Sequence, residues 1–279
     1  MTTKRLLGVF AHPDDEGMIG GTLLQYHTLG VETGLVYATR GEVGEIADPA
    51  LATPETLGQV REQEMRAAAD ALHVSKLWFL GYRDSGMEGT PENQDARAFI
   101  QASPAEVVGK LVAIIREFRP QVMVTFDETG GYGHPDHIAI YRYTTAAYHA
   151  AADAVQYPEL GPAHAVSKLY YTSFPRSGIR MMIEWMREQT YDDWFTRLDP
   201  EQFGLPDELI TVRLNVEEWE AEKARAWAMH RTQMNPNTVM ATIPEALQRK
   251  WRSQECFQLV TSRVGQDQPG ENDLFAHVP

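Results

Sequence analysis

RLLGVFAHPDDE, from Arg5 to Glu16, joins a short apolar run to a strongly polar loop. A continuous apolar run of this kind is typical of a strand buried on both faces of a parallel sheet. Similar runs follow at Leu35–Ala38, Leu77–Leu80, Val122–Phe126 and Leu169–Thr172. Amphipathic helical patterns lie between the runs, as over residues 65–72 and after Ser103-Pro104. This alternation predicts an α/β fold with a doubly wound, mostly parallel sheet.

The last third of the chain is less regular. Pro158, Pro162 and Pro175 interrupt the pattern, residues 209–214 predict a further strand, and residues 217–231 predict a helix. No internal repeat or low-complexity tract divides the sequence. We therefore expect one domain over residues 1–279, with a core at about 5–172 and an extension at about 173–279 packed on it.

The composition excludes several classes of protein. With 25 Lys and Arg against 39 Asp and Glu, the net charge of −14 disfavours nucleic acid as a partner. The single cysteine, Cys256, excludes an internal disulfide and a thiolate-rich zinc site, so a metal would be held by histidines and carboxylates. No apolar run approaches the roughly 20 residues of a membrane-spanning helix, and the first residues lack a secretory signal. We expect a cytoplasmic protein that binds no membrane.

Two polar loops of similar composition follow the first and fourth apolar runs. The first is AHPDDE at residues 11–16 and the second is GGYGHPDH at residues 130–137. Ligands of parallel α/β sheets bind beyond the carboxyl ends of the strands, so we expect these loops to form the site. One His-Pro-Asp tripeptide is usually a turn, but two copies at strand ends favour a metal centre. Two imidazoles and a carboxylate suit Zn²⁺ or Fe²⁺ and leave positions open for water and substrate.

These two motifs resemble those of the PIG-L/LmbE-like zinc-dependent deacetylase family. The resemblance continues through residues 40–45, 79–90 and 114–120, covers about residues 5–155, and is greatest to the branch that holds the mycothiol-pathway deacetylase and the mycothiol S-conjugate amidase. It implies a Rossmann-like fold, a Zn²⁺ cofactor with Fe²⁺ as the alternative, and removal of the N-acetyl group from an N-acetylglucosamine-containing glycoside. The expected setting is biosynthesis of a low-molecular-weight thiol such as mycothiol or bacillithiol. A homo-oligomer is compatible with the resemblance.

The resemblance also implies roles for the two loops. His12, Asp15 and His137 would be the metal ligands, and Asp14 would be the general base that deprotonates the attacking water. Spacing alone does not separate the roles of Asp14 and Asp15.

Further residues take their roles from the same resemblance. His134 would stabilise the oxyanion or protonate the leaving amine, and Tyr132 would help to polarise the amide carbonyl. Asp136 would orient His134 through a ring nitrogen. Arg61 would contact the aglycone, and Asp84 would bind sugar hydroxyls.

Purely structural roles are the alternatives for Arg61 and Asp84. Arg61 has the alternative of a surface ion pair with Glu62 or Glu64 on its own helix. Asp84 has the alternative of a turn before Ser85-Gly86. An inositol or a malate aglycone would suit Arg61 equally well.

Other side chains are expected to be structural. We expect the six remaining histidines, including His230, to be structural or exposed to solvent, and Cys256 to be a small buried residue. The sequence assigns no role to residues 174–208.

Two other functions are considered. The first is hydrolysis of another amide, in a thiol S-conjugate or another acylated sugar. The second is a nucleotide-binding module without hydrolysis. The sequence disfavours the second, because no Gly-x-Gly-x-x-Gly follows the first strand and the acidic loop would repel a pyrophosphate.

Overall fold

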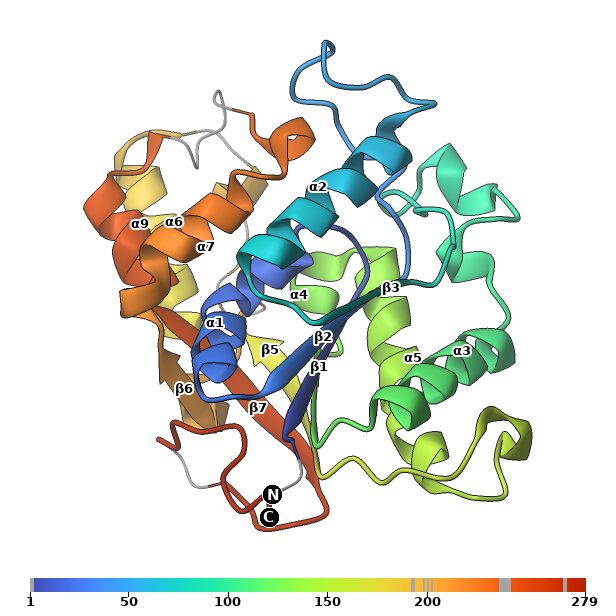
Figure 1. Ribbon diagram of the computed structural model, residues 1–279. Coiled ribbons are helices and arrows are strands. Elements are labelled where there is room, and N and C mark those ends of the chain that lie inside the picture. The colour runs from blue at the N-terminus through green and yellow to red at the C-terminus, as the bar shows by residue number, and fades with distance from the viewer. Residues whose placement is uncertain are drawn as a thin grey trace.

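The computed structural model describes residues 3–191, 194–197, 199, 201, 203–235, 242–267 and 270–279. Its centre is a seven-stranded sheet in the order β3-β2-β1-β4-β5-β7-β6 (Figure 1). The strands are β1 Arg5–Phe10, β2 Glu32–Tyr37, β3 Lys76–Phe79, β4 Val122–Thr125, β5 Lys168–Ser173, β6 Val212–Asn215 and β7 Gln254–Ser262. The five apolar runs of the sequence correspond to β1 to β5.

Strands β3, β2, β1, β4 and β5 are parallel, whereas β7 runs antiparallel to both β5 and β6. The predicted doubly wound, mostly parallel sheet is therefore confirmed. The chain moves from β1 outward to β2 and β3, and then returns to place β4 on the other side of β1. The carboxyl ends of β1 and β4 thus flank the point where the winding reverses, which is where ligands bind in such sheets.

Helices cover both faces of the sheet. They are α1 Gly20–Thr28, α2 Leu57–Ala71, α3 Pro104–Phe118, α4 Gly130–Gly133, α5 Pro135–Ala152, α6 Arg176–Glu188, α7 Glu220–Trp227 and α9 Glu245–Arg252. Helices α3 and α5 pack on each other on one side, and α7 packs against α1 and α2 on the other (Figure 1). The apolar stripe predicted after Ser103-Pro104 is the buried face of α3. Among the described helices, none is long and apolar enough to cross a membrane.

The C-terminal extension adds two strands to the same sheet. The strand predicted at 209–214 is β6, and it starts later because Asp207–Leu209 forms a turn of 3₁₀ helix. The helix predicted at 217–231 is shorter than expected, since α7 ends at Trp227. Strand β7 was not predicted, because its polar and apolar residues do not alternate regularly and only part of it is buried. Within residues 174–208, α6 is the main element, and positions 192, 193, 198, 200 and 202 lie outside the described residues.

Candidate active site

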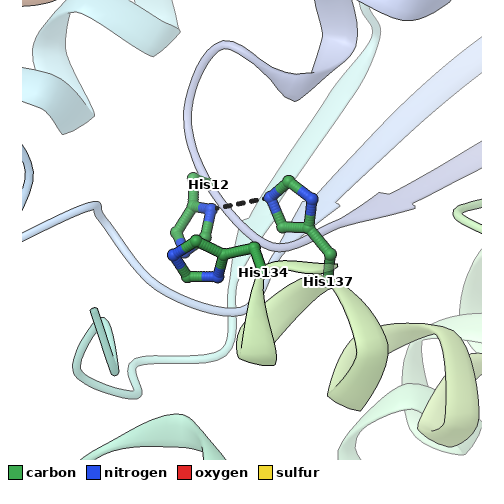
Figure 2. Close-up of side chains that lie close together, drawn as sticks. All are labelled: His12, His134 and His137. Atoms are coloured by element: carbon green, nitrogen blue, oxygen red, sulfur yellow. Dashed lines mark hydrogen bonds between the residues drawn. The ribbon is translucent and has the colours of Figure 1, made fainter. Parts of the chain in front are cut away.

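The two His-Pro-Asp loops meet at the reversal point of the sheet. His12 follows β1, whereas His137 lies in the first turn of α5, and the Nδ1 atom of His12 is 3.2 Å from the Nε2 atom of His137 (Figure 2). The ring of His134 lies beside both, with centroid distances of 4.6 Å to His12 and 5.0 Å to His137. All three imidazoles are buried. The predicted convergence of the loops is therefore present.

The carboxylate of Asp15 lies close to the rings of both His12 and His137. Its Oδ1 atom lies 3.4 Å from Nε2 of His137, and its Oδ2 atom lies 3.9 Å from Nδ1 of His12. The backbone N–H groups of Ala11 and His12 donate to Oδ2 at 3.1 and 2.7 Å, which fixes the direction of the carboxylate. Two ring nitrogens and one carboxylate therefore surround a common point.

The outer nitrogen of each ring has a partner that selects its tautomer. Nδ1 of His137 lies 3.0 Å from the carbonyl oxygen of Gly130, and Nε2 of His12 lies 3.1 Å from Oδ2 of Asp136. Burial opposes protonation of His12, but Asp136 and Asp84 raise the pKa of the ring, so without a cation a proton lies between the two inner nitrogens. A divalent cation can take the place of this proton, because the lone pairs of both inner nitrogens then point at it, and tetrahedral ligands about 2.1 Å from zinc lie about 3.4 Å apart. The donor set therefore fits a divalent metal ion.

Other groups around His12 also offer metal-binding atoms. His12, His134 and His137 form one set, and His12, Asp84 and Asp136 form another. In the second set the carboxylates face Nε2 of His12 and also accept backbone N–H groups, from Ser85 to Asp136 at 2.9 Å and from Gly86 to Asp84 at 2.9 Å. Those carboxylates are thus placed to orient His12 from behind rather than to face His137.

Asp14 adopts an unusual backbone conformation beside this centre. Its φ of 109° is rare for a residue other than glycine and is of the kind that costs roughly 1–3 kcal/mol. The Oδ2 atom accepts a hydrogen bond of 2.6 Å from Nε2 of Gln233. Burial raises the pKa of Asp14 to about 8, and the charges of Asp15 and Glu16 add to the effect. A cation beside Asp14 would lower this pKa again, because it favours the ionised form.

The contacts of Asp136 and His134 differ from those expected. The Asp136 carboxylate contacts His12, while the backbone N–H of Asp136 donates to Nδ1 of His134 at 3.1 Å. The expected hydrogen bond from the Asp136 side chain to His134 is not formed, because the first turn of α5 places the backbone amide there instead. Since Nδ1 of His134 accepts, its proton belongs on Nε2. Burial, together with the charges of His12 and His137, lowers the pKa of His134 to about 3, so its ring is neutral.

Tyr132 lies at the rim of the centre. Its ring centroid is 5.1 Å from that of His137 and 6.2 Å from that of His134, and 44% of the residue is exposed. It stands in α4, a short kinked element in which Gly131 and Gly133 have φ values of 75° and 90°, a region that glycine adopts without strain. Burial of the hydroxyl and the charge of Asp15 raise the pKa of Tyr132, which keeps the hydroxyl as a hydrogen-bond donor.

Arg61 points inward rather than into solvent. It is 6% exposed, and its Nη2 atom donates to the carbonyl oxygen of Glu45 at 3.1 Å. A Cβ atom at Gly41 or Gly44 would overlap with the guanidinium, so these glycines make room for it. Burial lowers the pKa of Arg61, while the charges of Asp14 and Asp84 oppose that shift, which places Arg61 within electrostatic reach of the centre.

The surface ion pair considered for Arg61 is wrong, because both candidate partners are engaged elsewhere. Glu62 pairs with Arg40 and Arg66, at 2.5 and 2.6 Å. Glu64 accepts hydrogen bonds from the backbone and side chain of Thr232.

Asp84 forms the turn that was the alternative to sugar binding, and it also makes a contact with His12 that the sequence did not predict. It accepts the N–H of Gly86 in a turn, and its Oδ1 atom also lies 3.6 Å from Nε2 of His12. Burial alone would raise the pKa of Asp84, but the hydrogen bond and charge of His12 hold it well below its usual range. Asp84 therefore stays ionised at the wall of the centre.

Sequence reasoning missed the C-terminal residues of the site. His230 is fully buried with Nε2 2.5 Å from Oε1 of Glu16, and Gln233 donates to Asp14. His230 was expected to be structural or exposed, without a link to the loop. Both residues lie more than 210 positions from their partners, and no local pattern marks them.

The whole chain is similar to known proteins. The profile of the family described as GlcNAc-PI de-N-acetylase (PIG-L) matches residues 7–148. A 1D-myo-inositol 2-acetamido-2-deoxy-alpha-D-glucopyranoside deacetylase from Geodermatophilus obscurus is 40% identical and covers 99% of both chains. A deacetylase of the same name, numbered 1, from Catenulispora acidiphila is 37% identical over 98% of this chain and 89% of its own. The solved N,N'-diacetylchitobiose deacetylase of Pyrococcus horikoshii has a TM-score of 0.64 at 20% identity, over 99% of this chain and 87% of its own, and so shares the fold.

Proposed function

Because the chain belongs to the GlcNAc-PI de-N-acetylase (PIG-L) family, we propose that it is a metal-dependent deacetylase acting on N-acetylglucosamine linked to myo-inositol. The observation that carries the proposal is the convergence of His12, Asp15 and His137, with Asp14 beside them, in a chain 40% identical over its length to a deacetylase of that name. The setting we propose is biosynthesis of a low-molecular-weight thiol such as mycothiol.

His12, Asp15 and His137 would hold the metal. A bound Zn²⁺ or Fe²⁺ would act as a Lewis acid on the amide carbonyl and on the attacking water. The residues behind the ligands would keep the centre rigid, because Asp136 holds the outer nitrogen of His12 and the Gly130 carbonyl holds that of His137.

Asp14 would transfer the proton. As water attacks the carbonyl carbon, a C–O bond forms and the Asp14 carboxylate takes the proton that water loses. When the C–N bond breaks, the nitrogen must be protonated, since an amide anion does not leave. Asp14 returns the proton to that nitrogen, and the products are acetate and the free amino sugar.

His134 and Tyr132 would stabilise the negative charge that develops on the carbonyl oxygen. The neutral His134 ring carries its proton on Nε2, because Nδ1 accepts from the Asp136 backbone. A neutral donor aimed at an oxyanion contributes about 3 kcal/mol to the transition state. Because the ring is neutral, it suits oxyanion stabilisation better than proton delivery, which would leave it as an imidazolate. Tyr132 would supply a second donor from the rim.

Arg61 and Asp84 would bind the substrate away from the amide. The Arg61 guanidinium has donors suited to the hydroxyls of inositol, and the ionised Asp84 carboxylate has acceptors suited to the sugar hydroxyls. Arg61 lies in a space made by two glycines, so its position is defined before substrate arrives.

The substrate proposal is tested by direct competition of aglycones. The metal-loaded protein is assayed with N-acetylglucosaminyl-inositol, N-acetylglucosaminyl-malate and a mycothiol S-conjugate, and the free amine is measured. We expect the highest kcat/KM for the inositol glycoside. A higher value for the S-conjugate would instead support the amidase alternative. Nucleotide binding is disfavoured, since Asp14, Asp15 and Glu16 lie in the segment after the first strand, where they would repel a pyrophosphate.

A further inference from the structure

We propose that Glu16 is a positioning residue that holds Asp14 in the orientation needed for proton transfer; the inference rests on the proposed function. The Oε2 atom of Glu16 accepts the backbone N–H of Asp14 at 3.0 Å. This contact acts on the backbone of the base, whereas Gln233 acts on its carboxylate. Glu16 would therefore set the direction in which the Asp14 side chain projects from the backbone.

Asp14 needs such a contact because its backbone conformation is unfavourable. Its φ and ψ are 109° and −23°, a region that residues with a Cβ atom rarely adopt. The neighbours on both sides are fixed: Pro13 has a restricted φ, and the Asp15 carboxylate is held by the N–H groups of Ala11 and His12. The backbone torsion angles of Asp14 are therefore the ones left to be restrained, and Glu16 restrains them by accepting the N–H of Asp14.

Glu16 is itself locked in place by two partners from distant parts of the chain. The hydroxyl of Tyr37, at the end of β2, donates to Oε2 at 2.7 Å, and Nε2 of His230 lies 2.5 Å from Oε1. Glu16 is 2% exposed, while Tyr37 and His230 are fully buried. Both carboxylate oxygens are thus engaged, so the acceptor for Asp14 has one orientation.

A merely structural role for this carboxylate is separated from a positioning role by a matched control. Glu255 is also buried and accepts the backbone N–H groups of Gly21 and Thr22, at 2.9 and 2.7 Å. It therefore performs the same chemistry at the start of α1, and within the part of the chain that the structure describes it makes no hydrogen bond to Asp14. Loss of Glu255 tests what removing a buried carboxylate does to the fold alone.

The experiment compares Glu16→Ala, Glu16→Gln and Glu255→Ala with the wild type, using N-acetylglucosaminyl-inositol. For Glu16→Ala we expect kcat to fall at least tenfold, with KM within twofold and unchanged metal content per chain, since small misplacements of a catalytic group reduce turnover strongly. Glu16→Gln keeps one oxygen acceptor and is expected to recover kcat to within about threefold. Glu255→Ala is expected to unfold at a lower temperature while the folded enzyme keeps its kcat. A wild-type kcat in Glu16→Ala, a parallel loss of metal, or an equal fall in Glu255→Ala would overturn the proposal.

Two further measurements keep the proposal testable if Glu16→Ala does not fold or if the substrate is different. Tyr37→Phe removes one partner of Glu16 and keeps the ring, and we expect kcat to fall about threefold at unchanged KM; an unchanged kcat counts against the proposal. A crystal structure of Glu16→Ala without metal reports the φ of Asp14 directly, and we expect this φ to leave the positive region. A retained positive φ overturns the positioning role whether or not the wild type deacetylates this substrate, whereas an inactive wild type overturns only the proposed function.

Discussion

Nδ1 of His12 and Nε2 of His137 lie 3.2 Å apart, although the two residues are 125 positions apart in the chain. The approach is possible because β1 and β4 are neighbours at the reversal point of the sheet, and each histidine follows the carboxyl end of its strand. Each ring turns its outer nitrogen to a hydrogen-bond partner and its inner nitrogen to the other ring. This relationship is the basis of the first prediction.

His137→Ala is expected to lower the metal content of the purified protein to well below one ion per chain. The substitution removes one of three ligands, and the two that remain bind a divalent ion much more weakly. Elemental analysis of the variant and the wild type, purified in parallel, measures the change. Full metal content in His137→Ala would contradict the proposed ligand set and would favour the group of His12, Asp84 and Asp136.

Asp14→Asn is expected to keep the metal and to lose between 10² and 10⁴ in kcat, because the amide has the shape of the carboxylate but does not accept the proton. Steady-state kinetics with elemental analysis of the same sample checks both parts. Turnover near that of the wild type would show that another group is the base. Loss of metal would instead show that Asp14 is a ligand.

His134→Ala is expected to lower kcat by about 10²–10³, since it removes a donor to the oxyanion. The pKa of His134 is lowered to about 3, so the ring is already neutral from weakly acidic to basic pH. The loss is therefore expected to be the same at every pH between about 6 and 9. If His134 acted as a charged acid, its contribution would fall as pH rises through its pKa, and the ratio of wild type to variant would change across that range.

Arg61→Ala is expected to raise KM for the inositol glycoside by roughly 10- to 100-fold, because hydrogen bonds from a charged donor contribute about 1.5–3 kcal/mol. The effect on free N-acetylglucosamine, which has no aglycone, is expected to be much smaller. Arg66→Ala is the control, since Arg66 lies on the same helix but pairs with Glu62 at the surface. Equal losses for both substrates would place Arg61 at the sugar or in the fold rather than at the aglycone.

Asp267→Ala is expected to destabilise the protein by about 3–5 kcal/mol, because it leaves the ammonium of Lys168 buried without its partner. Both side chains are fully buried, and the Tyr170 hydroxyl also donates to Asp267. Denaturant unfolding followed by fluorescence measures the change. The double variant Lys168→Met/Asp267→Leu is expected to recover much of the lost free energy of unfolding. If the double variant is as unstable as Asp267→Ala, the unpaired Lys168 is not the cause of the destabilisation.

The local part of the architecture was readable from sequence. The five buried strands of the core appeared as continuous apolar runs, and α3 appeared as a stripe that starts after Ser103-Pro104. These features depend on neighbours within a few residues, so periodicity and turn chemistry encode them. The extension was read less well, because the side chains of β7 are half-buried between β5 and β6 and show no regular pattern.

The candidate site, like the fold, could be predicted from the sequence only in part. The ligand types and the two loops were apparent in the sequence, since His12, Asp14, Asp15, His134 and His137 all lie in two short motifs. The partners of these residues were not apparent. The Asp136 side chain was expected to contact His134 but contacts His12 instead. The reason is that the start of α5, which carries His134 and Asp136, turns the Asp136 carboxylate toward the first loop.

What the sequence determined by itself is therefore the sheet, the two loops at its reversal point and the donor types available to a metal. Which side chains fix those donors depends on how distant segments pack in the folded chain. His230 and Gln233 reach the first loop from more than 210 positions away, and Arg61 is buried because Gly41 and Gly44 leave space beside it. The physical reason is that a strand or a turn is stabilised by its sequence neighbours, whereas the partner of a buried polar group is set by which distant backbones the packed fold brings within hydrogen-bond distance.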